Sequence, residues 1–227
     1  NGLVGYWTFD GRDIKWSDTG TEIKDISGNG NHGDALGSLA TTSVIPGKLG
    51  QALSFNGTSD YVDMGDFFYS DVISICAWVD MRTLPVVDHR VIVTKRNIGI
   101  YGSSSEFTLG VSYVPQRYRI VYFTFDSSQN TTLSITGGTE LSNTNLWYHV
   151  CAVQNGSGNT GYVYLNGMED GSAAQGNASA NAGSSVQIGV RTGGTGERFW
   201  DGFIDDVRIY NRALSASEVT NLYNIGR

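Results

Sequence analysis

The sequence has little proline, little charge and no long apolar run. Only 3 of its 227 residues are Pro, and charged residues make up 16%, against about a quarter in an average globular protein. Such a composition excludes a coiled coil or collagen, and no run approaches the roughly 18 apolar residues that a membrane helix needs. With 40% hydrophobic residues, the chain is too apolar to be disordered. The sequence therefore predicts a folded protein without membrane insertion.

Positive charge is also scarce. The chain has 15 Lys and Arg against 22 Asp and Glu, a formal net charge of −7. A general phosphate-binding surface would have to form against the field of the whole molecule, so nucleic acid is disfavoured as a partner. The chain begins at Asn1 without Met or an apolar leader. This favours a secreted or cell-surface protein whose signal peptide or neighbouring domain has been removed, although an arbitrary truncation would look the same.

Glycine and aromatic residues, by contrast, are abundant, with 30 Gly and 11% aromatic residues. Short runs of alternating apolar and polar residues recur between clusters of Gly, Asn, Ser and Asp. This pattern predicts an all-β antiparallel sandwich, and we expect one domain over residues 1–227. The expected strands cover residues 3–9, 52–55, 61–64, 72–79, 90–95, 107–114, 118–125, 147–153, 162–165, 186–190 and 203–210.

Two short motifs give local structure. Asn166-Gly167 lies between two alternating runs and favours a two-residue hairpin turn, because such turns need positive φ at both positions. Ser215 followed by Glu218 forms a capping-box pattern, which predicts one short C-terminal helix. The Gly- and Ser-rich stretches at 137–145 and 171–185 are expected to be loops at the sheet ends.

Four segments resemble the LamG-like jelly-roll family, within the concanavalin A-like lectin and glucanase fold. They are GLVGYWTFDG at 2–11, DISGNGNHG at 25–33, GKLGQALSFNGTSDYVDMG at 47–65 and DGFIDDVRIYNRALSASEV at 201–219. WYHVCAVQNGSGNTGYVYLNG at 147–167 matches more loosely. The resemblance implies a jelly roll of two packed antiparallel sheets, one of them concave, with both chain ends in neighbouring strands.

The two cysteines lie in the middle of expected strands. Cys76 and Cys151 are each followed by Ala, and they could face each other across adjacent strands or be two buried free thiols. ISICAW and YHVCAV resemble the two strands that a disulfide joins in pentraxins, where His also stands two residues before the second Cys. The resemblance implies a Cys76–Cys151 disulfide, which would favour an oxidising compartment.

Oxygen-bearing side chains from distant parts of the chain suit calcium, which takes about six to eight oxygen ligands. Zinc is disfavoured because the chain has only 3 His and its cysteines are not spaced as ligands. Many LamG-like relatives hold a structural calcium where the first strand, the DISGNGNHG turn and the IDDVRIYN strand meet. The resemblance implies a Ca²⁺ site at Asp10, Asp25, Asn29, Asn31, His32, Gly33, Asp205 and Asp206.

The strand FIDDVRIY at 203–210 supplies two of these carboxylates. Its apolar face is made by Phe203, Val207 and Ile209. Alternation puts Asp205 on that face and Asp206 on the opposite one. An inward carboxylate needs a partner, and a cation would supply one. The alternative is that SGNGNHG is only a tight turn and that Asp205 pairs with Arg208 or Arg212.

Signatures of catalysis are missing from the chain. The E-x-D-x-x-E string of glucanases of this fold is absent, although retaining glycosidases need two carboxylates close together. YRIVYF at 118–123 supplies Tyr and Arg but lacks the His and Gln companions found in lyases of this fold, and G-x-S-x-G is also absent. A hydrolase or lyase therefore stays an alternative that rests on the fold alone.

Binding of a poly- or oligosaccharide is the favoured function. Sugars are held by aromatic faces and by polar groups that bond hydroxyls, and the segment 81–135 concentrates such groups outside the family motifs. The candidate contacts are Asp88, His89, Arg90, Arg96, Tyr101, Tyr113, Arg117, Tyr118, Arg119 and Tyr122. The tyrosines could equally fill strand faces. The alternative function is protein adhesion or a spacer role, and a monomer is expected.

The five tryptophans divide into two groups. Trp7, Trp78 and Trp147 occupy strand positions that match the family and are expected in the core. Trp16 lies in a polar segment and Trp200 precedes an Asp-Gly turn, so both are freer to reach solvent and a ligand. Trp16 could also fold back on the sheet.

Overall fold

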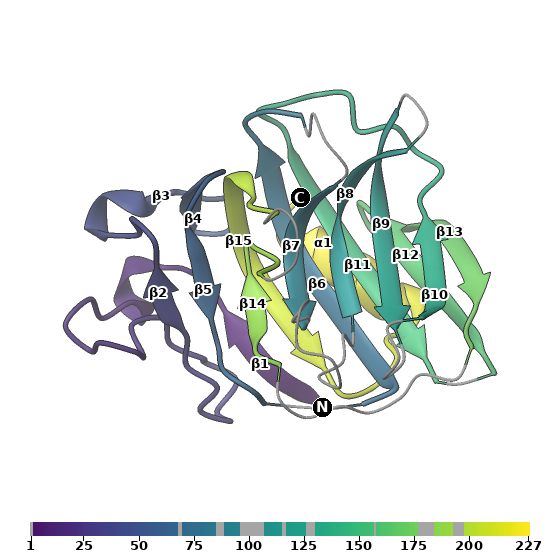
Figure 1. The fold of residues 1–227 in the computed structure, drawn as a ribbon, viewed down its shortest axis with the longest axis horizontal. Helices are drawn as coiled ribbons and strands as arrows, with labels where there is room; N and C mark the ends of the chain where they lie inside the picture. Colours follow the sequence, from purple (N-terminus) through teal and green to yellow (C-terminus); the bar gives the residue numbers. More distant parts are fainter. Residues whose placement is uncertain are drawn as a thin grey trace.

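The strands form two antiparallel sheets around a shared core (Figure 1). The computed structural model describes residues 2–67, 70–84, 89–95, 107–114, 117–125, 130–156, 158–176, 184–192 and 198–227. Besides the strands, this part contains one α-helix, α1 (Ala216–Ile225), and two single-turn 3₁₀ helices at Gly11–Asp13 and Thr41–Ser43. The two-sheet jelly roll that the resemblance implied is confirmed. No described helix is long and apolar enough to cross a membrane.

The first sheet has eight strands. In spatial order it contains β13 (Met168–Ala174), β12 (Thr160–Leu165), β11 (Trp147–Asn155), β6 (Val72–Met81), β15 (Asp201–Tyr210), β4 (Gln51–Asn56) and β3 (Val44–Pro46). The eighth strand, β1 (Leu3–Trp7), pairs with β15. Strands from the two ends of the chain are therefore neighbours, as expected.

The second sheet has seven strands. It runs, in spatial order, through β10 (Thr131–Thr136), β9 (Arg117–Phe125), β8 (Phe107–Val114), β7 (His89–Lys95), β14 (Val186–Ile188), β5 (Tyr61–Asp63) and β2 (Asp34–Leu36). In Figure 1 these strands cross the view from β2 on the left to β10 on the right. The alternation of each strand sends one set of side chains into the space between the sheets and the other set outward.

Most apolar side chains fill the space between the sheets. Trp7 and Phe55 of the eight-stranded sheet and Tyr122 and Ile120 of the seven-stranded sheet are fully buried in one cluster. A second, smaller cluster lies on the outer face of the eight-stranded sheet, where Val219 of α1 packs over Tyr164 and Tyr210. The helix thus covers the far side of the eight-stranded sheet, away from the seven-stranded one.

The helix and the hairpin form where the motifs predicted them. Ser215 Oγ accepts from Glu218 N at 3.3 Å, and Glu218 Oε2 accepts from Ser215 N at 2.9 Å, which completes the capping box before α1. Asn166 and Gly167 have φ of 50° and 79° and join β12 to β13. The expected loop at 171–185 is wrong at its start, because β13 continues to Ala174.

The two cysteines lie opposite each other on adjacent strands. Cys76 of β6 and Cys151 of β11 are register partners with Cα atoms 4.1 Å apart. They form a disulfide within the outer cluster under α1. The pentraxin-like pairing is confirmed, and the alternative of free thiols is wrong.

His149 is buried beside this disulfide. Its Nε2 lies 3.9 Å from Cys151 Sγ, and its ring contacts Trp78 at 5.1 Å between centroids. Burial lowers the pKa of His149 from 6.5 to about 3, with a smaller contribution from the charge of Arg208. The folded protein therefore holds this imidazole neutral where the unfolded chain protonates it.

We expect this histidine to weaken the fold as the pH falls. A depressed folded pKa means that stability is lost below the unfolded value of about 6.5 and down to about 3. Between pH 7 and pH 5 the loss from His149 should be about 2 kcal/mol in the free energy of unfolding. Denaturant titrations of the wild type and His149→Gln check this. The variant should lose correspondingly less stability over the same range, and equal losses would contradict the assignment.

Candidate functional site

The strand β15 changes partners halfway along its length. Residues Asp201–Ile204 pair with β4, whereas Val207–Tyr210 pair with β1. Asp205 and Asp206 belong to neither pairing, and the register on the β6 side shifts between Asp205 and Arg208. Asp206 has a φ of 52°, a value that side chains other than Gly adopt rarely. The two carboxylates therefore sit at a β-bulge where β1 and β4 meet end to end.

The bulge overturns the expected facing of this strand. Ile204, Val207 and Ile209 enter the core, whereas Phe203 is only half-buried and lies outside that cluster. Alternation then places Asp205 with Phe203 on the outer face. The prediction that Asp205 shares a face with Val207 was wrong because the bulge reverses the alternation between them.

Asp205 is fully buried despite its outward position. Its Oδ2 accepts from Leu49 N at 2.7 Å. The loop can come this close because residue 47 is Gly, since a Cβ there would lie 2.7 Å from the same oxygen. Its Oδ1 has no hydrogen-bond partner in the described part of the chain. Burial raises the pKa of Asp205 to about 7, and the charges of Asp206 and Asp10 raise it further.

Asp10 and Asp206 stand beside a cleft of about 380 Å³ over this bulge, and we call it the bulge cleft. Its lining includes Tyr6, Thr8, Asp10, Leu49, Gly50 and Asp206. Asp10 Oδ1 accepts from Gln51 N at 2.8 Å, and its Oδ2 pairs with Arg12 Nη2 at 3.1 Å. The structure thus brings Asp10, Asp205 and Asp206 together from the two ends of the chain.

Asp206 is held by its own pair of donors. Tyr6 Oη donates to Asp206 Oδ1 at 2.5 Å, and Arg208 Nη2 donates to the same oxygen at 3.0 Å. Burial, together with the charge of Asp206, raises the pKa of Tyr6 to about 12. The alternative in which Asp205 pairs with Arg208 or Arg212 is not what is observed, because Arg208 serves Asp206 and Arg212 pairs with Glu218 at 2.6 Å.

The DISGNGNHG turn occupies the other edge of β1. Asn29 Nδ2 donates to Leu3 O at 3.0 Å, and Asn31 Nδ2 donates to Val4 O at 2.7 Å. Asp25 accepts from Tyr6 N, Ser27 N, Ser27 Oγ and Asn31 N. These side chains stand in for a neighbouring strand, and both oxygens of Asp25 already hold protein donors.

His32 and Gly33 also lie away from the bulge cleft. His32 Nδ1 accepts from Asp25 N at 3.1 Å, and Gly33 forms a β-bridge with Ile23. His32 lines a second cleft of about 310 Å³, together with Asp34 and Asp63. Burial and the nearby Glu22 raise the pKa of Asp34. The eight predicted calcium ligands are therefore divided between the bulge and the turn.

The predicted ligand contacts do not form one patch. Asp88, Arg96 and Tyr101 lie outside the described residues. Tyr113 is 45% exposed and its ring lies 5.1 Å from that of half-buried Tyr118.

Two of the predicted contacts are wrong because their side chains are in the core. Tyr122 is fully buried and donates to Gln154 Oε1 at 2.9 Å. Trp200 is also fully buried, with Nε1 donating to Phe203 O at 3.3 Å. Trp16 is half-buried against the core cluster, the folded-back arrangement considered above. Trp147 is the reverse case, since it was expected in the core and is only half-buried.

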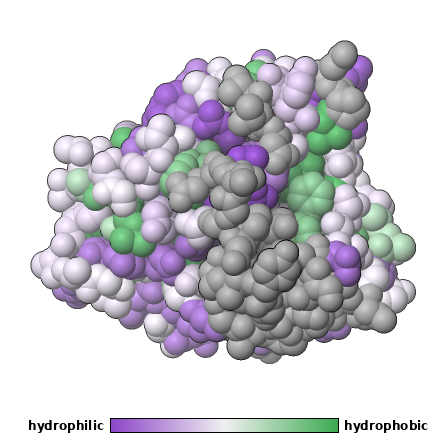
Figure 2. All heavy atoms as spheres, viewed as in Figure 1, coloured by the Kyte–Doolittle hydropathy of each residue, from purple (hydrophilic) through white to green (hydrophobic). Residues whose placement is uncertain are grey.

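Two further predicted contacts, His89 and Arg119, lie on the outer face of the seven-stranded sheet. His89 of β7, Ser112 of β8 and Arg119 of β9 are register partners in one row. Arg119 and Phe123 alternate with the core residues Ile120 and Tyr122, so both side chains project outward. The rings of Phe123 and His89 are 6.3 Å apart. Figure 2 shows hydrophobic side chains in green beside hydrophilic ones in purple on the described part of the face seen in Figure 1.

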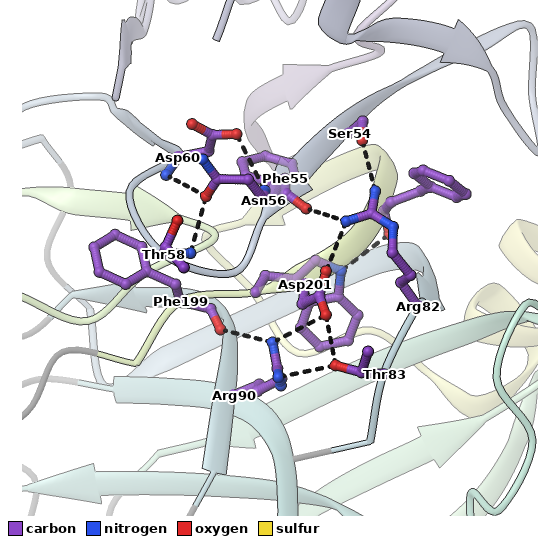
Figure 3. A network of polar contacts seen from close by, with 12 residues as sticks. Ser54, Phe55, Asn56, Thr58, Asp60, Arg82, Thr83, Arg90, Phe199 and Asp201 are labelled. Atoms are coloured by element: carbon purple, nitrogen blue, oxygen red, sulfur yellow. Dashed lines mark hydrogen bonds and ion pairs between the residues drawn. The ribbon is translucent and has the colours of Figure 1, made fainter. Parts of the chain in front are cut away.

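Sequence reasoning missed a polar network at one end of the sandwich. In Figure 3 Asp201 lies between Arg82, which directly follows β6 of the eight-stranded sheet, and Arg90 of β7 in the other sheet. Arg82 Nη1 donates to Asp201 Oδ1 at 2.6 Å, Thr83 Oγ1 donates to Asp201 Oδ2 at 2.5 Å, and Arg90 Nη2 donates to Thr83 Oγ1 at 3.0 Å. The network therefore ties the start of β15 to β7.

An aromatic pair on the outer face of the eight-stranded sheet was also missed. Trp147 and Phe203 have ring centroids 6.3 Å apart, and the guanidinium of Arg82 lies 5.4 Å from the Phe203 ring. Strand period was the available signal, because Trp147 precedes buried Tyr148 and Phe203 precedes buried Ile204. The pair offers a second aromatic surface for comparison with Phe123.

Several solved structures share this architecture. Domain 4 of AbnA, a GH43 extracellular arabinanase from Geobacillus stearothermophilus in complex with arabinotriose, has a TM-score of 0.70 and 22% identity, with 97% of this chain and 98% of that one covered. The binding domain of Paraclostridial Mosquitocidal Protein 1 has a TM-score of 0.70 and 18% identity over 99% of this chain, which spans only 52% of that one. The heptameric SAP-like pentraxin from Limulus polyphemus has a TM-score of 0.58 and 20% identity, covering 75% and 80% of the two chains.

These likenesses establish the fold, which binding modules share with some glycosidases. No curated protein matches the chain significantly. A family model, in contrast, matches residues 56–220, which is most of the sequence. The chain belongs to the Laminin_G_3 family of the concanavalin A-like lectin/glucanases superfamily.

Proposed function

We propose that this chain is a secreted, calcium-stabilised carbohydrate-binding module that uses the outer face of its seven-stranded sheet. The observation that carries the proposal is the set of outward side chains on β7, β8 and β9, above all Arg119 and Phe123. Both are half-buried, so each can contact a ligand while its position is fixed by the sheet. An aromatic ring and hydrogen-bond donors on the same face are the combination that sugar recognition needs.

The comparisons support binding rather than cleavage. One neighbour carries arabinotriose and others are receptor-binding domains, so a carbohydrate or a protein is the expected class of partner. The Cys76–Cys151 disulfide supports an oxidising compartment outside the cytosol.

The test is a glycan array probed with the wild type, Phe123→Ala and Phe203→Ala. Phe123→Ala should lower the affinity for the bound glycan about tenfold, because it removes the apolar surface on which a sugar face rests. Phe203→Ala is the matched control, since it removes the same ring from the outer face of the other sheet. Loss of binding only in Phe203→Ala would place the site there and overturn this assignment.

The same experiment separates the competing functions. Silence across plant, algal and animal glycans with a correctly folded wild type would favour protein adhesion or a spacer role. The release of reducing ends or unsaturated uronates from these polysaccharides would instead establish a hydrolase or lyase.

The bulge cleft fits a calcium ion. Besides the guanidinium groups of Arg12 and Arg208, its lining offers oxygen ligands, namely the carboxylates of Asp10 and Asp206 and the hydroxyl of Thr8, and calcium prefers oxygen ligands. Asp205 beneath it keeps one buried oxygen without a partner, and a buried carboxylate is costly without a compensating charge. A bound calcium would supply that charge and would tie β1, β15 and the loop at Leu49 together.

We expect calcium to raise the melting temperature. At a concentration one hundred times its dissociation constant, a bound ion adds about 2.7 kcal/mol to stability, equivalent to roughly 5–10 °C for a chain of this size. Differential scanning calorimetry with calcium and with EGTA measures the shift. Asp205→Asn should lose it, whereas Asp63→Asn in the second cleft should keep it. A wild type that melts at the same temperature in both buffers would remove calcium from the proposal.

A further inference from the structure

Five consecutive strands of the seven-stranded sheet carry no acidic residue. β10, β9, β8, β7 and β14 are consecutive neighbours in this sheet, and none of their residues is Asp or Glu. The same strands contain His89, Arg90, Lys95, Arg117 and Arg119. In a chain with a net charge of −7, these strands supply cations and no carboxylate, although Lys95 pairs with Asp66 from outside them.

Arg119 differs from the other arginines of this region. Arg117, two residues earlier, lies 4.0 Å from Glu140, and Arg90 bonds Thr83 and lies 3.8 Å from Asp201. Arg119 has neither a hydrogen bond nor an ion pair in the described part of the chain, and its Nε is buried there without a partner. Arg119 is only half-buried, so an incoming anion can reach the rest of its guanidinium and supply the charge partner that it lacks.

Arg119 belongs to a row of residues that crosses three neighbouring strands. Ser112 is its register partner, and His89 follows in the same row. His89 accepts from Arg191 Nη1 through Nε2, at 3.0 Å, and its ring lies 6.3 Å from that of Phe123. His89 and Arg191 are buried, whereas Arg119 and Phe123 are half-buried. On this face a ligand can therefore contact Arg119 and Phe123, while His89 and Arg191 stay buried beside them.

Arg119 and Phe123 are four residues apart on one strand, about 13 Å at the usual rise per residue. More than one sugar ring is needed to span that distance. A planar guanidinium bonds a carboxylate through two parallel hydrogen bonds, while an aromatic face takes the C–H face of a sugar.

We propose that this module binds an acidic oligosaccharide, with a sugar carboxylate held by Arg119 and a neighbouring ring resting on Phe123. The inference depends on the carbohydrate binding proposed above and names the chemical class of that ligand. The observation that supports it is the guanidinium of Arg119, which has no carboxylate partner in the described part of the chain and lies among strands without Asp or Glu.

The test uses pairs of oligosaccharides that differ only in the carboxyl group. Oligogalacturonate, oligomannuronate and glucuronan fragments are each compared with their carboxyl-reduced forms by isothermal titration calorimetry. We expect at least one acidic form to bind ten times more tightly than its reduced partner. Arg119→Gln should abolish that preference, and Arg119→Lys should retain part of it because the charge stays while the planar fork is lost.

Arg227→Gln is the matched control, because it removes the same charge from an exposed residue and should keep the preference. Neutral oligosaccharides that bind as well as the acidic forms would overturn this inference and leave the proposed function standing. Binding of sulfated galactan oligosaccharides alone would overturn the carboxylate assignment. No binding to any oligosaccharide by a folded protein would contradict the proposed function itself.

Discussion

The double variant Cys76→Ala/Cys151→Ala should unfold with about 4 kcal/mol less free energy than the wild type. The disulfide closes a loop with a sequence separation of 75 residues, and its loss frees that loop in the unfolded chain. For a domain of this size the change corresponds to roughly 8–16 °C in melting temperature. Calorimetry under non-oxidising conditions measures it.

The control for this variant is reduction of the wild type. Both cysteines are buried under α1, so packing losses from the alanines add to the loss of the loop constraint. Reduced wild type keeps the sulfur atoms and isolates the constraint. If reduced and oxidised wild type melted together, the disulfide would contribute nothing to the stability of this fold.

Trp200→Ala should be the most damaging single tryptophan replacement among Trp200, Trp147 and Trp16, at about 3–5 kcal/mol. The side chain is fully buried between the sheets, and its indole N–H donates to Phe203 O. Removing it leaves a large cavity and breaks the hydrogen bond to Phe203 O. Urea denaturation at constant pH measures the loss in the free energy of unfolding.

Trp147→Ala is the matched comparison, because Trp147 was expected in the core and Trp200 at the surface. Trp147 is half-buried on the outer face beside Phe203, so its loss should cost clearly less than that of Trp200. An equal or larger loss for Trp147→Ala would contradict the burial described for these two residues.

Regular elements were predictable where a local rule decides them. Alternation located β8 and β15 to within two residues at either end, and the capping box at Ser215 located the start of α1. The strands at 34–36, 44–46, 131–136 and 168–174 were missed. β13 was missed because it is polar and largely exposed at a sheet edge, where burial imposes no alternation.

The bulge shows why the carboxylates were only partly predictable. The sequence placed Asp10, Asp205 and Asp206 among eight candidates, and the structure brings these three together. Alternation in the sequence cannot reveal a β-bulge. The bulge in β15 forms where its pairing changes from β4 to β1, and that change depends on the tertiary fold. Arg119 was predicted as a sugar contact because it is an arginine outside the family motifs. Whether it has a partner depends on the side chains that neighbouring strands bring close to it, which the sequence does not show.

The DISGNGNHG turn, which hydrogen-bonds to the free edge of β1, affects how the protein behaves in concentrated solution. An open strand edge recruits strands from other molecules and promotes aggregation, but here Asn29 and Asn31 already occupy Leu3 O and Val4 O. Asn29 precedes Gly30, a pair in which the amide is chemically labile. Deamidation would replace the N–H donor by a carboxylate that repels the carbonyl of Leu3. Ageing of a single side chain would thus free the carbonyl of Leu3, while Asn31 still holds that of Val4.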